Sequence, residues 1–166
     1  ILGLNFNALV YGSHPYGLRS SGEVATVGGI TRDDLVDFYR RHYTAGQAVV
    51  AIMGNLSRSE AEALADRLTA DLPRSNEPAV IPAVPPLARA EIRAVAHPAS
   101  QSHLLIGAPG IKRDDPDYFP LFVGNYILGG GGFTSRLTDE VRQKRGFAYS
   151  AYSYFSPLLR EGPFVV

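Results

Sequence analysis

Residues 128–157 read LGGGGFTSRLTDEVRQKRGFAYSAYSYFSP. After the run of glycines, the pattern predicts a helix from about Thr134 to Arg145. Gly146 is a suitable helix stop, because glycine readily adopts the left-handed conformation found just after many helices. The aromatic-rich stretch 147–155 predicts a strand. This part of the chain is therefore expected to form a helix, a tight turn and a strand.

The two faces of the predicted helix differ in character. Leu137 and Val141 lie four residues apart, so they share a face and are expected to point inward. Arg136 and Glu140 have the same spacing on the outer face, where an ion pair between them is expected. The helix thus offers one face to a core and the other to solvent.

Two further helices are predicted in the first half of the chain. Thr31 is a good N-cap, and the helix that it begins has acidic residues in its first turn, where the helix dipole favours them. The apolar face of this helix is formed by Leu35, Phe38, Tyr39 and His42. Ser57 and Glu60 form a capping box at the start of the second helix, which Pro73 ends. Because it lies on an apolar face, His42 is expected to be packed in a core.

Short apolar runs predict the strands. The run from Gln47 to Met53 has the length of a buried strand. Residues 90–97 and 101–108 are expected to pair with each other as a hairpin, and residues 163–166 to form another strand. The mixture of helices and strands predicts an α+β protein, with helices packed on mixed or antiparallel sheets.

A proline-rich stretch divides the chain. Residues 73–89 hold five prolines, and such a stretch is extended and cannot join a helix or a central strand. It is predicted to be a linker between domains at 1–72 and 90–166. Residues 1–11 are expected to be a helix end or a buried segment, and Asp115 to cap a helix in the second domain.

The composition is typical of a globular protein. The chain has 166 residues, of which 45% are hydrophobic and 19% charged. Its 16 basic and 16 acidic side chains cancel, which argues against a general binder of nucleic acids or anionic membranes. Without cysteine, disulfides and thiolate chemistry are excluded, and no apolar run is long enough to predict a membrane span. Because it starts at Ile1 and stops in a strand-like segment at Val166, the chain is expected to be an internal fragment of a longer protein.

The glycines at 129–132 do not match known nucleotide-binding loops. A Walker loop needs Gly-Lys-Ser/Thr to supply a cation and a magnesium ligand, but Phe133 and Thr134 follow here. The dinucleotide pattern fails too, because no strand precedes the glycines. A tight corner between two helices is expected instead, since glycine permits close backbone approach.

The four histidines do not form a zinc motif. His14, His42, His97 and His103 lack the i, i+4 helical spacing of a zinc pair. His97 and His103 flank the predicted hairpin, and a metal site between them is disfavoured. No Gly-x-Ser-x-Gly nucleophile elbow is present, although composition alone does not exclude a Ser-His-Asp triad.

Arg142 and Tyr149 are the candidate binding residues. Arg142 points away from the apolar face of its helix, and Tyr149 follows the Gly146 turn, so a guanidinium and a phenol are expected to lie close together. The pair suits a peptide backbone, because Arg donates to carbonyl or carboxylate oxygens and Tyr can stabilise a developing oxyanion. The alternative is that Arg142 complements the helix dipole and Tyr149 packs. The residues alone favour this alternative.

The stretch 128–157 resembles the pitrilysin or insulinase family of zinc metallopeptidases, which includes the mitochondrial processing peptidases. Three other stretches are also similar to this family: HPYG at 14–17, TRDDLVDFYRRHYTAGQAVVAIMGN at 31–55 and DPDYFPLFVGNYILGG at 115–130. The resemblance therefore covers nearly the whole chain. It implies a bacterial protein of repeated α+β units, which enclose a chamber where peptides are cut.

The resemblance also implies a position for this chain within the family. Residues 1–72 would be the second half of an N-terminal peptidase-like unit, and residues 90–166 the first half of the following unit. The family's His-x-x-Glu-His zinc motif is not in this sequence and is expected outside it, so no catalytic residue and no metal ligand is assigned here. Arg142 and Tyr149 match the spacing and context of the family's substrate-binding Arg and Tyr, and they are assigned that role.

Two functions are compatible with this resemblance. The chain is expected to be part of a zinc-dependent endopeptidase, to which it contributes substrate binding and the chamber wall. The alternative is a non-catalytic partner or scaffold subunit of a two-chain peptidase. In both cases zinc is expected in the parent enzyme or its partner subunit, the ligand is a peptide, and a homo- or heterodimeric partner is expected. The chain is not expected to be active alone, and a bacterial periplasm or cell envelope is favoured over the cytoplasm.

Overall fold

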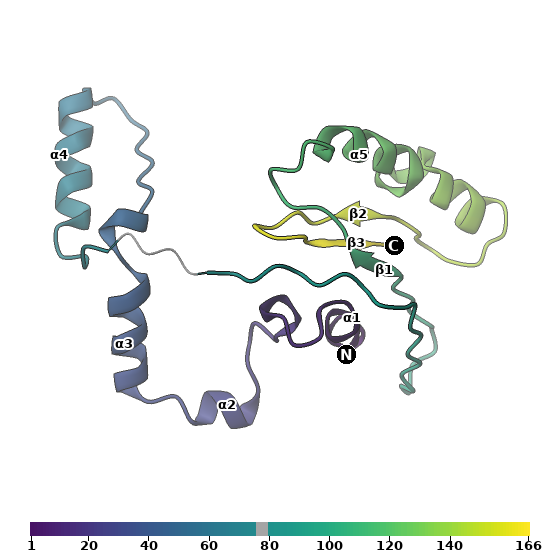
Figure 1. Ribbon diagram of the computed structural model, residues 1–166. Coiled ribbons are helices and arrows are strands. Elements are labelled where there is room, and N and C mark those ends of the chain that lie inside the picture. The colour runs from purple at the N-terminus through teal and green to yellow at the C-terminus, as the bar shows by residue number, and fades with distance from the viewer. Residues whose placement is uncertain (76–79) are drawn as a thin grey trace. The chain divides into compact units, whose positions relative to one another are not determined.

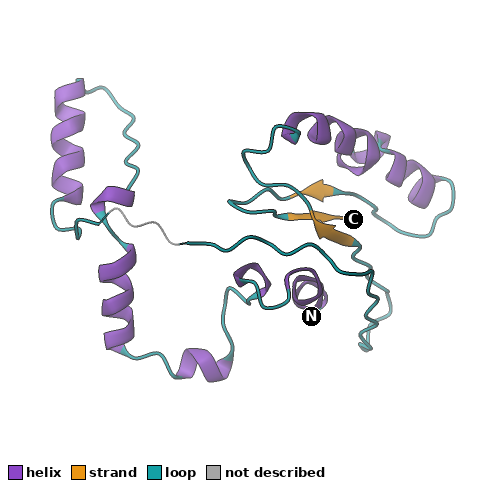
Figure 2. Cartoon of the chain, viewed as in Figure 1, coloured by secondary structure: helices purple, strands orange, loops and turns teal. Residues whose placement is uncertain are grey.

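The computed structural model of the chain describes residues 1–75 and 80–166 (Figure 1). It has two compact units, one of residues 1–20 and 81–166 and the other of residues 21–80. The described residues are mostly helical with one small antiparallel sheet (Figure 2), which confirms the predicted α+β class in its coarse form. None of the helices in these residues is long and apolar enough to cross a membrane.

The sheet of the first unit has three short strands in the order β1-β3-β2. They are β1 (Gly107–Pro109), β2 (Tyr154–Phe155) and β3 (Pro163–Val165). Both outer strands pair antiparallel with β3, and Phe164 lies opposite Ala108 on one side and Phe155 on the other. The strand predicted at 163–166 is thus confirmed, and it is the centre of the sheet.

The core of the first unit lies between the N-terminal helix α1 (Leu2–Tyr11) and this sheet. Phe6, Val10 and Tyr11 of α1 are buried with Val165 of β3, so the segment predicted at 1–11 is a helix with a buried face. Burial raises the pKa of Tyr11 to about 12, and its hydroxyl donates to the backbone oxygen of Glu161 at 3.3 Å. This helix therefore contacts residues from the other end of the chain.

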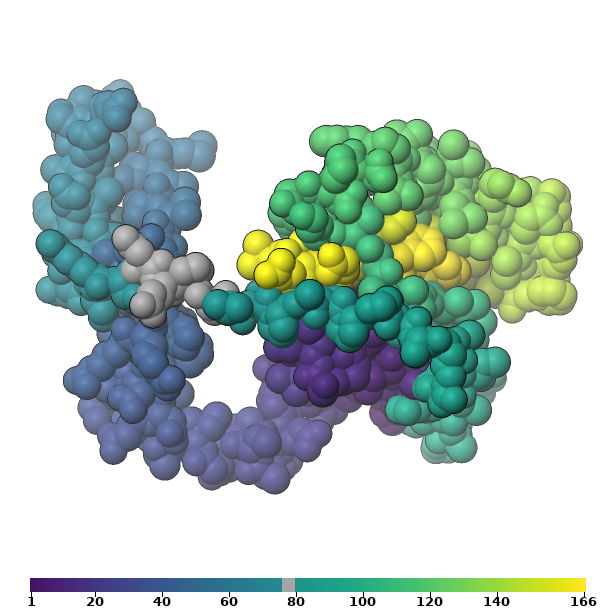
Figure 3. Space-filling model, viewed as in Figure 1, coloured from purple at the N-terminus to yellow at the C-terminus, as the bar shows by residue number. Residues whose placement is uncertain are grey.

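The described part of the proline-rich stretch is extended and contains no helix or strand. The imidazole Nε2 of His14 lies 3.0 Å from the oxygen of Pro82, and Arg160 Nε donates to the oxygen of Ile81 at 2.9 Å. Figure 3 shows residues 81–89 passing along the N-terminal residues of the same unit. The linker predicted at 73–89 falls partly on residues 76–79, which lie outside the described residues. Its role as a boundary between domains stays a prediction.

The described residues of the second unit contain three α-helices, α2 (Val24–Gly28), α3 (Arg32–His42) and α4 (Arg58–Thr69), and the short 3-10 helix η2 (Ala45–Gln47). Both predicted capping residues, Thr31 and Ser57, are confirmed. Thr31 Oγ1 accepts the backbone N–H of Asp34 at 3.2 Å, and Asp34 in turn accepts the N–H of Thr31 at 2.8 Å. Ser57 and Glu60 form the same reciprocal pair at the start of α4. Such local signals set helix starts regardless of what the helix later packs against.

Two core predictions in the second unit are wrong. His42 is exposed rather than packed, and its ring lies 4.5 Å from the ring of Phe38 on the same helix. Residues 47–53 are not a strand, and Val49 and Met53 are 94% and 98% exposed. A strand needs a hydrogen-bonded neighbouring strand, and the described residues of this unit contain no strand.

The hairpin predicted from residues 90–97 and 101–108 is also wrong. Only β1 forms a strand in this region, and its partner is β3. Ile106 and Val166 exchange backbone hydrogen bonds of 3.0 and 2.8 Å. The C-terminal segment therefore pairs with this region in place of residues 90–97. The strand predicted at 147–155 is likewise reduced to β2.

Candidate functional site

The candidate site is built on a helical corner. Helix α5 (Tyr118–Asn125) continues into the π-helical segment η3 (Tyr126–Gly130), and the short turn η4 (Gly132–Thr134) leads to the π-helical segment η5 (Thr138–Gln143). The prediction of a tight helical corner at the glycines is therefore confirmed. The cap of α5 is Asp117 rather than the predicted Asp115, whose carboxylate accepts the N–H of Asp117 at 2.9 Å.

The π-helical geometry shows in hydrogen bonds between residues five apart. Gly131 N–H donates to the oxygen of Tyr126 at 2.8 Å, and Lys144 N–H donates to that of Asp139 at 2.9 Å. Such segments are rare, and they occur frequently at functional sites. They widen the helix, so side chains five residues apart can meet.

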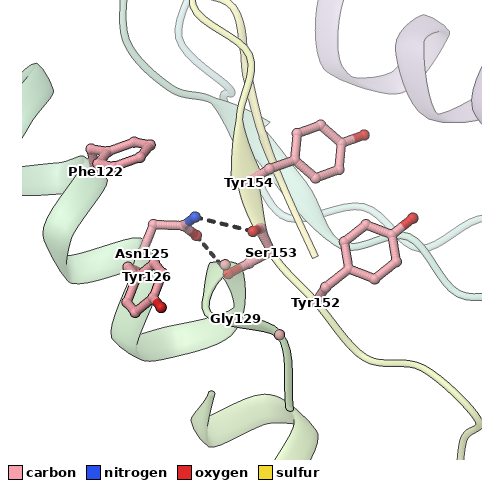
Figure 4. A pocket seen from close by; sticks show the side chains of 9 residues that line it. Phe122, Asn125, Tyr126, Gly129, Tyr152, Ser153 and Tyr154 are labelled. Carbon is pink, nitrogen blue, oxygen red and sulfur yellow. Dashed lines mark hydrogen bonds between the residues drawn. The ribbon is translucent and has the colours of Figure 1, made fainter. Parts of the chain in front are cut away.

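Hydrogen bonds between half-buried Asn125 and buried Ser153 hold the helical corner against the strand side. Asn125 Nδ2 donates to the backbone oxygen of Ser153 at 3.0 Å, and Ser153 Oγ donates to Asn125 Oδ1 at 2.6 Å (Figure 4). Gly129 lies directly against this pair, because a Cβ built on it would be 2.5 Å from Ser153 N and 2.7 Å from Leu137 Cδ1. The helical corner approaches the strand this closely only because residue 129 has no side chain.

An open hollow of about 440 Å³ lies beside the Asn125–Ser153 pair (Figure 4). It is lined by Phe122, Asn125, Tyr126, Gly129, Gly130, Gly132, Tyr152, Ser153 and Tyr154. The rings of Tyr152 and Tyr154 stack with their centroids 6.1 Å apart. Because Asn125 and Ser153 satisfy each other, the hollow presents mainly apolar surface, much of it aromatic.

The structure brings Arg142 and Tyr149 together, as their sequence context predicts. The Arg142 Cζ atom lies over the Tyr149 ring, 4.9 Å from its centroid, and also over the Phe133 ring at 4.9 Å. Tyr149 is 86% exposed. Within residues 1–75 and 80–166, the Arg142 guanidinium has no carboxylate partner and no hydrogen-bond acceptor. Its donors and the Tyr149 hydroxyl are thus available to a ligand.

The carboxylate of Glu140 pairs with two cations. It lies 2.7 Å from Lys144 Nζ and 2.6 Å from Arg145 Nη1, so its partner is not the predicted Arg136. The five-residue repeat of the π segment accounts for the Arg145 pair. Hydrogen bonds from Lys144 and then Arg145 lower the pKa of Glu140 from 4.5 to about 2. The positive charges of Lys144 and Arg145 are therefore balanced by Glu140.

The described residues offer no metal site. No group of three or more His, Cys, Asp or Glu side chains within them could hold a metal ion. His14 is buried and hydrogen-bonded through both nitrogens, while His97 and His103 are exposed. The residues described here therefore do not fit a zinc ion.

Two features of the site are missed by the sequence interpretation. The sequence pattern does not predict that the Phe133 ring contacts Arg142. Asn125 carried no expectation, although it bonds Ser153 twice. The glycine run was the available signal for both, because it marks a close approach without naming what is approached.

Replacing Asn125 by alanine is expected to destabilise the first unit by about 1–3 kcal/mol, because Ser153 is buried and loses both of its partners. Urea unfolding measures the change in the free energy of unfolding. Asn55→Ala, at an exposed position, is the control and is expected to change it by less than about 0.5 kcal/mol. Equal stabilities of the two variants would contradict a structural role for the pair.

The ion pairs of Glu140 predict an unusual acid titration. Because its folded pKa of about 2 lies below the ordinary 4.5, the stabilising contribution is present above pH 4.5 and is lost as the pH falls towards 2. NMR titration of the Glu140 carboxyl carbon is expected to show this low midpoint. Lys144→Ala should raise the midpoint, whereas Lys112→Ala, which affects a separate ion pair with Asp114, should not. A midpoint near 4.5 in the unaltered protein would show that the pairs do not persist in solution.

Comparisons with known proteins identify the relatives of the chain. An uncharacterized zinc protease of Streptomyces coelicolor is 36% identical over 91% of this chain, and the uncharacterized zinc protease YmxG of Bacillus subtilis is 29% identical over 88%. The chain spans about a third of the length of these relatives (34% and 35%). The description as zinc proteases applies to these relatives as whole proteins.

Solved structures agree with this relationship. The crystal structure of a peptidase M16 inactive domain from Pseudomonas fluorescens is 43% identical and superposes with a TM-score of 0.92, over 98% of this chain and 39% of the other. A protease from Helicobacter pylori is 25% identical with a TM-score of 0.78, over 97% and 39%. The family described as peptidase M16 inactive domain matches residues 29–166. The resemblance to the pitrilysin group is thereby confirmed, and the chain belongs to the peptidase M16 (pitrilysin) family as part of its inactive domain.

Proposed function

We propose that this chain supplies part of the substrate-binding chamber of a zinc-dependent endopeptidase, in which Arg142 and Tyr149 bind the backbone of a peptide. One observation carries the proposal. The Arg142 guanidinium lies over the Tyr149 ring, while its N–H groups have no acceptor within the described residues. A guanidinium left without a protein acceptor is ready to donate to an external oxygen.

The chemistry of the pair fits a peptide. Arg142 can donate two hydrogen bonds in one plane to a carbonyl or a terminal carboxylate. The phenol of Tyr149 is a donor that can reach an oxygen on which negative charge develops. The pair therefore orients a peptide and stabilises charge on it, while the zinc ion and its ligands belong to the parent enzyme or its partner subunit.

The same proposal extends to the architecture and the partner. Residues 1–72 and 90–166 are halves of two successive α+β units joined by the proline-rich stretch, and a second subunit of the same or another kind completes the chamber. The matched lengths support this, because the solved relatives continue well beyond the aligned part. The exposed apolar side chains of α5, such as Phe119 at 74%, provide surface for such packing.

A non-catalytic partner subunit is the second candidate. It is favoured by one observation: the family model that matches residues 29–166 is described as an inactive domain. The parent protein would then contribute Arg142, Tyr149 and the chamber wall to an enzyme whose zinc ion is held by another chain.

Zinc analysis of the full-length parent protein, purified alone, distinguishes the two candidates. About one tightly bound zinc per chain, with hydrolysis of a quenched fluorescent peptide, would assign it to the active subunit. No zinc, with hydrolysis only after a zinc-binding partner chain is added, would assign the partner role. No hydrolysis with or without such a chain would contradict both.

A further inference from the structure

We infer that Phe133 is a positioning residue that, together with Tyr149, restrains the guanidinium of Arg142 so that its N–H groups face a bound peptide. This inference rests on the proposed function. It concerns a residue that is itself 70% exposed and therefore adds little to a core. The Arg142 Cζ atom lies 4.9 Å from the centroid of the Phe133 ring, within the range of a cation–π contact.

The backbone around Phe133 explains why its ring stays beside Arg142. Phe133 lies in the short turn η4, and its backbone oxygen accepts a hydrogen bond from Gln143 Nε2 at 3.1 Å. Gln143 follows Arg142 directly in the chain, so the turn that carries the ring is tied to the helical segment that carries the cation. Gly132 has a φ of +61°, a conformation that glycine adopts without strain.

The second ring is positioned from the other end of the same segment. Gly146, with a φ of +64°, lies three residues after η5, and its N–H donates to the oxygen of Arg142 at 3.0 Å. The chain then turns back towards Tyr149. The turns at Gly132 and Gly146 thus place the exposed rings of Phe133 and Tyr149 beside one guanidinium.

This arrangement has a consequence for binding. A free arginine side chain has many rotamers and loses that freedom when it binds. A guanidinium already held against two rings loses less, so a peptide meets donors that are preorganised. The rings cover the faces of the guanidinium, which carry no hydrogen-bond donor. The N–H groups in its plane stay free to donate to carbonyl and carboxylate oxygens.

Three variants of the full-length protein test the inference. Phe133→Leu removes the aromatic ring and keeps an apolar side chain. Phe133→Trp keeps an aromatic ring and is the rescue variant, because indole binds cations well. Phe147→Leu is the matched control, since Phe147 is 78% exposed in the same region and no cation–π contact with it is present in the described residues.

The first measurement does not depend on activity. The rate at which phenylglyoxal modifies Arg142, followed by mass spectrometry of its peptide, reports how well the guanidinium is shielded. Phe133→Leu is expected to raise this rate by about three- to tenfold, while Phe133→Trp and Phe147→Leu leave it near the original value. An unchanged rate in Phe133→Leu would overturn the inference.

The second measurement is peptide hydrolysis by the active parent assembly. Phe133→Leu is expected to raise KM by about three- to tenfold with little change in kcat, and Phe133→Trp to restore it. If Arg142→Ala lowers kcat/KM while Phe133→Leu changes nothing, the positioning role is overturned and the proposed function stands. If Phe133→Leu raises the rate at which Arg142 is modified but neither Phe133→Leu nor Arg142→Ala alters the kinetics, the proposed function fails. The inference then fails with it.

Discussion

Replacing Arg142 by alanine is expected to lower the kcat/KM of the active parent assembly by about 10²–10³-fold, because the charge-assisted hydrogen bonds of the guanidinium to the peptide are lost. The guanidinium contacts the Phe133 and Tyr149 rings but has no carboxylate partner within residues 1–75 and 80–166, so its removal leaves no unpaired charge behind. Zinc content and the free energy of unfolding should therefore be unchanged. Steady-state hydrolysis of a peptide, with metal analysis of the same sample, measures both.

Two further variants separate the contributions of the pair. Tyr149→Phe keeps the ring over Arg142 and removes only the hydroxyl, so a smaller loss in kcat/KM is expected. Arg142→Lys keeps the charge but loses the planar arrangement of donors, and it should recover only part of the activity. Arg136→Ala, at an exposed position on the same helical segment, is the control. Unchanged kinetics in both Arg142→Ala and Tyr149→Phe would show that the pair does not act on substrate.

Local signals in the sequence predict the helix boundaries well. Thr31 and Ser57 cap their helices as expected, and Gly146, three residues after the last residue of η5, adopts the left-handed conformation. Each of these signals acts over three or four residues, so it does not depend on the rest of the fold. Two of the predicted strands are wrong for the opposite reason. Residues 47–53 and 90–97 have strand-like sequences, but a strand forms only where another segment pairs with it.

The candidate site was predictable in part. The close approach of Arg142 and Tyr149 follows from a helix, a glycine turn and a returning chain, all of which are local. The contribution of Phe133 depends on a hydrogen bond from Gln143, ten residues away, and on π-helical geometry. The predicted Arg136–Glu140 pair assumed an ordinary α-helical repeat, whereas Glu140 pairs with Lys144 and Arg145.

Replacing Gly129 by valine is expected to destabilise the first unit by about 3 kcal/mol, at the upper end of the usual cost of overpacking. A Cβ at this position would lie 2.5 Å from the backbone nitrogen of Ser153 and 2.7 Å from Leu137 Cδ1. The backbone nitrogen cannot rotate away as the end of a flexible side chain can. The helical corner would have to separate from the strand, which breaks the hydrogen bonds between Asn125 and Ser153. Urea unfolding of the variant measures the loss.

The same substitution separates the packing of the corner from the chemistry of the site. Gly124→Ala is the matched control, because Gly124 lies in α5 and a Cβ there meets nothing within 4 Å; it is expected to be neutral or to stabilise by up to about 1 kcal/mol. Because Gly129 approaches Ser153, four residues after Tyr149, the strain in Gly129→Val should displace the chain that carries the phenol. The ring over Arg142 would then be disturbed, and phenylglyoxal should modify Arg142 faster. A Gly129→Val protein as stable as Gly124→Ala would mean that the corner does not pack against Ser153 as described.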